Sequence, residues 1–96
     1  QNNDPNNINI ELNEVVAAGV YANLALVNHS PSEFVLDFIQ LMPGVQQAKV
    51  RSRVIIAPLH AKRVLAALQQ NVQNYEAQFG EIKDVEPFVV GGDAQA

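Results

Sequence analysis

The sequence predicts an α+β domain, with about four antiparallel strands followed by one long C-terminal helix packed on one sheet face. Two observations carry this prediction: residues alternate between apolar and polar in several segments between residues 8 and 56, and a helical repeat of apolar residues follows. A length of 96 residues suits a single domain. We expect a disordered N-terminal tail at 1–7, the domain at 8–82 and an extended C-terminal tail at 83–96.

Four segments show the period of two that is typical of strands. The first is "INIEL" at 8–12, and the second, "VYANLALVNH", begins at Val20. The turn-forming residues "NHSPSE" then lead into "EFVLDFIQLM", which favours a hairpin. "QQAKVRSRVII" forms the last predicted strand before the helix.

The third of these strands carries an acid within an apolar run. Phe34, Leu36 and Phe38 share one face, while Asp37 falls on the other, less aromatic face, which we expect to be wet. On the following strand, strict alternation places three cations on one face: Lys49, Arg51 and Arg53. The sequence therefore predicts that Asp37 pairs with Arg51 or Arg53 across the sheet.

The predicted helix has clear ends and one apolar stripe. Pro58 suits its first turn, and Gly80 suits its C-terminal cap. Between them, apolar residues recur at spacings of 4, 3, 4, 3 and 4: Ala61, Leu65, Leu68, Val72, Tyr75 and Phe79. Such a stripe indicates packing against the sheet or against a second copy of the helix.

One helix covers only one face of a sheet, so the second face predicts an interface. Its candidate residues are Val35, Ile39, Leu41, Tyr21 and Val27. An uncovered apolar face on a protein of this size is typical of self-association or of partner binding. We therefore expect a homo-oligomer, with a homodimer favoured.

Cations cluster before and within the first turns of the helix, and they form the candidate anion-binding or partner-binding set: Arg51, Arg53, His60, Lys62 and Arg63. Cations at a helix N-terminus oppose the helix dipole, whereas a phosphate or carboxylate there is favoured. A plain solvated surface is the alternative. The net charge of -4 argues against nucleic acid as the partner.

Signatures of catalysis are missing from the sequence. There is no cysteine, the two histidines fall in no ligand cluster, and no serine sits in a nucleophile elbow. No phosphate-binding glycine motif occurs. We expect a protein that is no enzyme and takes no cofactor or metal. The lack of cysteine fits the cytoplasm, and no apolar run is long enough to span a membrane.

Three stretches carry a family resemblance: "EFVLDF" at 33–38, "PLHAKR" at 58–63 and "NYEAQFG" at 74–80. With them, residues 8–82 resemble domain of unknown function 3467, a family of short bacterial and archaeal proteins. The resemblance implies no activity. Relatives often carry Ser or Thr where Ala57 stands, so this chain lacks the usual side-chain cap of its helix. The order of strands and helix is also similar to that of SecB-type export chaperones, as an analogy of fold alone.

These observations favour a non-enzymatic, homo-oligomeric binding or adaptor protein whose partner the sequence does not identify. One alternative is a chaperone-type binder that grips extended polypeptides at strand edges. The other is a small nucleic-acid or nucleotide-binding regulator that uses the basic stripe of the strand at 49–53.

Overall fold

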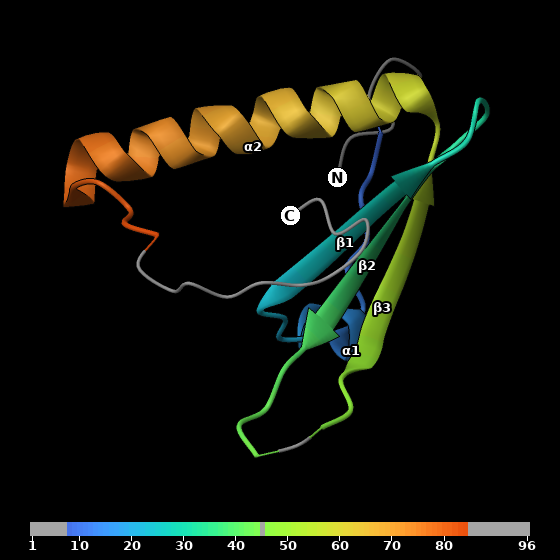
Figure 1. Cartoon of the computed structure of the whole chain (residues 1–96). Coiled ribbons are helices and arrows are strands. Elements are labelled where there is room, and N and C mark those ends of the chain that lie inside the picture. The colour runs from blue at the N-terminus through green and yellow to red at the C-terminus, as the bar shows by residue number, and fades with distance from the viewer. Residues whose placement is uncertain (1–7, 45, 85–96) are drawn as a thin grey trace.

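The computed structural model describes residues 8–44 and 46–84. It confirms the α+β class: three antiparallel strands are followed by a long C-terminal helix (Figure 1). The predicted tail at 1–7 lies outside the described residues, as do residues 85–96 of the tail predicted at 83–96. In chain order the elements are α1 (Glu14–Ala17), β1 (Leu24–His29), β2 (Phe34–Gln40), β3 (Lys49–Ile56) and α2 (Pro58–Phe79).

The N-terminal part of the domain is not a strand. Residues 8–13 are extended but pair with no strand in the described part of the chain, so the prediction of a strand at 8–12 is wrong for the single chain. Alternation gives a segment two faces, yet a strand also needs a neighbour for its backbone hydrogen bonds. A single helical turn, α1, follows, and the Asn13 side chain caps it by accepting a hydrogen bond from the Val16 N–H at 2.9 Å.

The sheet has the order β1-β2-β3, so β2 is central and consecutive strands are neighbours. The β1–β2 hairpin places Val27 opposite Leu36 and Leu26 opposite Asp37. Residues directly opposite each other share a face of the sheet. We call the side that carries Phe34, Leu36 and Phe38 the groove face, and the side that carries Asp37 the Asp37 face.

A β-bulge interrupts the pairing of β2 with β3. Phe38 lies opposite Ser52, but Ile39 lies opposite Val50, so Arg51 is an extra residue in β3. Relative to strict alternation from Arg53, the bulge exchanges the faces of the two β3 residues that precede Arg51. Lys49 lies opposite Gln40 on the groove face, and the predicted row of three cations on one face is therefore wrong.

Asn23 fastens the chain entering β1 to the end of β2. Its backbone N–H donates to the Ile39 carbonyl at 3.0 Å. Its side chain accepts from the Leu41 N–H at 2.7 Å and donates to the Leu41 carbonyl at 3.1 Å. This amide therefore extends the β1–β2 pairing beyond the last strand residues, in the manner of one more ladder step.

The helix α2 begins and ends where the sequence predicts. Pro58 occupies its first turn, and the Gly80 N–H donates to the Glu76 carbonyl at 2.9 Å with a positive φ of 98°. Figure 1 shows α2 starting at the end of β3 and then diverging from the strands. Only its first half therefore faces the sheet, and α2 contains no buried residue.

The start of α2 offers a simple test of local energetics. Ala57 precedes the helix in an extended conformation and makes no side-chain cap. We expect Ala57→Ser to stabilise the protein by about 1 kcal/mol, because the serine hydroxyl would accept a hydrogen bond from an unpaired backbone N–H in the first turn of α2. Thermal unfolding followed by circular dichroism should show a rise of roughly 4 °C or more. Ala57→Val, which suits the same backbone but cannot cap, should give no such rise.

The buried part of the described chain is very small. Only Ile39 and Asp37 are classed as buried there, each 5% exposed, and both lie on the Asp37 face of the central strand. Large apolar side chains on α2 and in the N-terminal segment are exposed. A domain of this length ordinarily buries about two thirds of its unfolded surface, so the single chain leaves apolar surface without cover.

Candidate functional site

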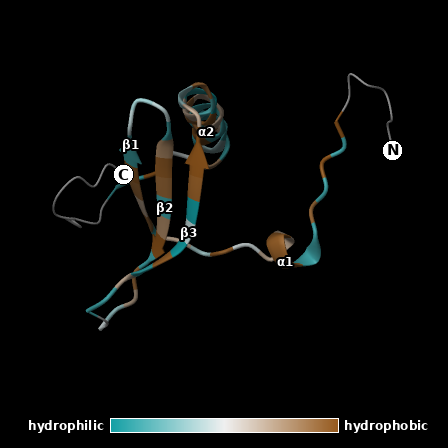
Figure 2. Cartoon of the chain, turned by 90° about the vertical axis from the view of Figure 1, so that its right-hand side faces the viewer, coloured by the Kyte–Doolittle hydropathy of each residue, from teal (hydrophilic) through white to brown (hydrophobic). Residues whose placement is uncertain are grey.

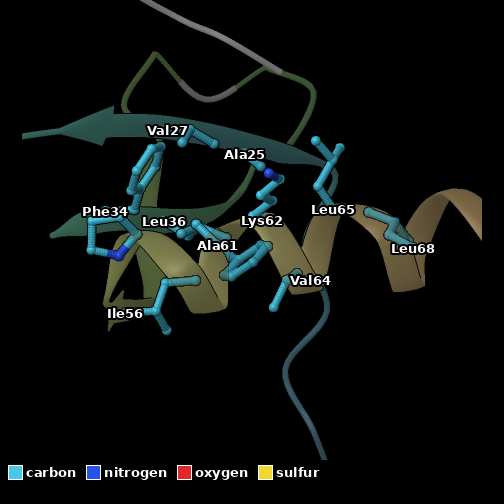
Figure 3. Close-up of a pocket in the computed structure, with 12 residues that line it drawn as sticks. Ala25, Val27, Phe34, Leu36, Ile56, Ala61, Lys62, Val64, Leu65 and Leu68 are labelled. Carbon is cyan, nitrogen blue, oxygen red and sulfur yellow. The ribbon is translucent and has the colours of Figure 1, made fainter.

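An apolar groove lies between the groove face of the sheet and the first half of α2. Its volume is about 640 Å³. Figure 3 shows side chains from β1 and β2 facing those of α2 across this space. Lys62 is the only charged residue among its lining, which consists of Ala25, Val27, Phe34, Leu36, Phe38, Ile56, Pro58, Ala61, Lys62, Val64, Leu65 and Leu68.

The predicted stripe of α2 runs out of this groove into solvent. Its five residues after Ala61 are between 37% and 66% exposed. Tyr75 and Phe79 contact each other at the far end of the helix, with ring centroids 5.0 Å apart. A continuous apolar surface therefore extends from the sheet along the whole of α2, and only its first part faces other residues of the described chain.

The opposite face of the sheet carries a bidentate ion pair. Asp37 and Arg53 are directly opposite in register. The Arg53 Nε donates to Asp37 Oδ1 at 2.7 Å, and its Nη2 donates to Oδ2 at 2.9 Å. These hydrogen bonds hold the pKa of the Asp37 carboxyl below its ordinary value of 3.8; burial opposes this shift, and the charge of Arg53 adds to it. The predicted pairing of Asp37 with Arg53 is confirmed.

The surroundings of Asp37 differ from the expectation. The prediction of a wet face is wrong, because the side chain of Asp37 is only 8% exposed while that of Arg53 is 60% exposed. The carboxylate lies in the central strand between β1 and β3, and it is covered by its neighbours, including its partner. The two hydrogen bonds replace the water that the carboxylate loses.

The predicted interface residues divide between different places. Val35 and Ile39 lie on the Asp37 face, as expected. The assignment of Val27 to that face is wrong, because its register partner is Leu36 and it lines the groove. Tyr21 is exposed in the segment before β1, and Leu41 follows β2. The phase of β1 against β2, which decides these positions, is set by the hairpin turn.

The candidate cations do not converge. Arg53 is occupied by Asp37, and the Arg51 Nη1 donates to the Gln40 Oε1 at 2.6 Å. Lys62 is at the groove, on the other side of the sheet from Arg53. His60 and Arg63 are exposed in the first turns of α2, and the geometry gives no support for one anion site built from all five residues.

The remaining candidate chemistry has structural explanations. His29 stacks on Phe34, its register partner, with ring centroids 5.4 Å apart. Within residues 8–44 and 46–84, no group of three or more potential metal-ligating side chains is found. Among the described helices, none is long and apolar enough to cross a membrane.

Fold and surface together define a small sheet-and-helix protein whose principal feature is an uncovered apolar groove continued by a helical stripe. The family described as "Protein of unknown function (DUF3467)" matches residues 1–84, and the chain belongs to this family. This match confirms the family resemblance that the sequence shows. No curated protein and no solved structure shows a significant match to the chain.

Proposed function

We propose that this protein is a non-enzymatic, homo-oligomeric binding or adaptor protein whose basic unit is a homodimer. The observation that carries the proposal is α2: 22 residues long, with a regular apolar stripe and without a buried residue. Burial of apolar surface is the main favourable term in folding, so a helix of this kind is stable when a partner covers its stripe.

A second copy of the chain suits this surface. Each chain has a groove that its own helix leaves open, and each has a helix half that extends past its own sheet (Figure 1). In a two-fold arrangement, the outer half of α2 from each copy can cover the open groove or the helix of the other copy, because both copies use the same surface. The outer half of α2, with Val72, Tyr75 and Phe79, would lie against the groove of the partner or against its helix.

The charges of α2 favour self-association. After Arg63, the only charged residue of the helix is Glu76, and the other polar residues are amides. Two identical helices can therefore approach with little repulsion between like charges.

The lack of cysteine suits a reducing compartment, and we place the protein in the cytoplasm.

Sedimentation velocity over a wide range of protein concentrations tests the proposal. We expect the full chain to sediment as a dimer at micromolar concentrations. A species with the mass of one chain, 10.5 kDa, at every concentration would contradict the proposal. Binding of further partners would then have to be sought for a monomer, with the groove as the first surface to examine.

A further inference from the structure

The N-terminal segment Ile8–Leu12 is the second apolar feature that the described chain leaves uncovered. Ile8, Ile10 and Leu12 alternate with Asn9 and Glu11, and the three apolar side chains are between 68% and 90% exposed. The backbone of this segment makes no hydrogen bond to the sheet within the described residues. Such an alternating extended segment is suited to pairing along the edge of a sheet.

The two edges of the sheet differ in how open they are. The β3 edge carries Lys49, Arg51 and Arg53 and contains the bulge, and both charges and bulges protect an edge from further pairing. The β1 edge, "LALVNH", contains no Asp, Glu, Lys, Arg or Pro. Within the described chain, β1 pairs with β2 alone, which leaves its outer backbone groups available. The β1 edge is therefore the better acceptor.

The position of the segment decides which chain it can pair with. Figure 1 and Figure 2 together show α1 and the segment before it standing apart from the sheet, off one of its faces. Within the described chain, the segment therefore lies along neither edge of its own sheet (Figure 2). The β1 edge of a second copy has the same sequence and the same free backbone groups. The segment can pair with it without turning back toward its own sheet.

From these observations we infer that Ile8–Leu12 of one chain adds as a fourth strand to the β1 edge of a second copy. This exchange rests on the proposed homodimer and extends it. Strand exchange of this kind is a common way for identical chains to associate, because the pairing elements are already present in each of them. It would cover the exposed Ile8, Ile10 and Leu12 and would complete a four-stranded sheet in each half of the dimer.

Because the chain contains no cysteine, single introduced thiols give an unambiguous test. A full-length chain with Asn9→Cys is unfolded and refolded together with a size-tagged full-length chain with Asn28→Cys on β1, and the mixture is treated with a short bismaleimide. At equal concentrations about half of the tagged chain pairs with an Asn9→Cys copy, and we expect up to this share of it to shift to the combined mass. The matched control replaces Asn28→Cys by Ser52→Cys on β3, and we expect little shift there.

Each other outcome contradicts the exchange. Cross-linking to Ser52→Cys in preference to Asn28→Cys would place the segment on the β3 edge. A doubly substituted chain that links Asn9→Cys to Asn28→Cys only within itself would show that the segment folds back on its own sheet. A dimer in sedimentation without the Asn28→Cys link would overturn the exchange and leave the homodimer standing, whereas a monomer would remove both.

Discussion

Leu68→Glu is expected to convert the protein from a dimer to a monomer. Leu68 lies in the middle of the α2 stripe, lines the groove and is 61% exposed in the single chain. Burial of a leucine contributes about 1.5–3 kcal/mol, and in a symmetric dimer each substitution counts twice. The expected loss of about 3–6 kcal/mol corresponds to a dissociation constant that rises roughly 100-fold or more. The charge of a buried glutamate adds to this loss.

Gln70→Glu is the matched control, because it adds the same charge on the opposite side of the same helix. Successive residues turn by about 100°, which places Gln70 about 200° from Leu68. Its side chain donates to Asn74 at 3.0 Å on that outer side. We expect the control to sediment like the unsubstituted chain. If both variants remained dimeric, the stripe would not be the interface, and the Asp37 face would be the next surface to substitute.

The second large effect concerns the ion pair of Asp37 with Arg53. The pKa of the Asp37 carboxyl is lowered in the folded chain and returns to its ordinary value on unfolding. The stabilisation is therefore fully present above pH 3.8 and is lost as the pH falls through the lower, folded-state pKa. We expect Asp37→Asn to have a lower urea midpoint than the unsubstituted chain at pH 7, and we expect this difference to shrink as the pH falls below 3.8.

Three further variants separate the contribution of the ion pair to stability from the general effect of acid. Glu33→Gln removes an exposed carboxylate just before β2 and should leave the difference between neutral and acid midpoints almost unchanged. Arg53→Met keeps an apolar chain over the carboxylate but removes its donors, so we expect a larger loss than from Asp37→Asn. The double variant Asp37→Leu, Arg53→Met should recover much of that loss. A flat difference between Asp37→Asn and the unsubstituted chain across this pH range would contradict the assignment.

The helix was predictable because its signals are local. Pro58 and Gly80 mark its ends, and the stripe follows from a spacing that holds in any helix of this sequence. The pairing of Asp37 with Arg53 was also predictable, since the two residues lie in neighbouring strands and carry opposite charges. Neither inference requires knowledge of how one strand is shifted against the next.

The features that sequence reasoning missed depend on pairing between segments. The position of Val27 follows from the register of the β1–β2 hairpin, and that of Lys49 from the bulge in β3. Alternation within one strand cannot supply either, because a shift of one residue exchanges the two faces. The apolar groove arises from the angle between α2 and the sheet, which a helical pattern leaves undetermined. The strand predicted at 8–12 failed because pairing, as well as pattern, defines a strand.

The bulge allows β3 to lose one residue without a change of register. In a regular strand, such a deletion would exchange the two faces beyond it. Because Arg51 is the extra residue, its removal would let Val50 stay opposite Ile39 and Ser52 stay opposite Phe38. Every other side chain would keep its side of the sheet, and only the Arg51 contact with Gln40 would vanish. Homologous chains shorter by one residue at this point can therefore retain the same architecture, and a gap placed there in a comparison of sequences marks a straightened strand rather than a shifted one.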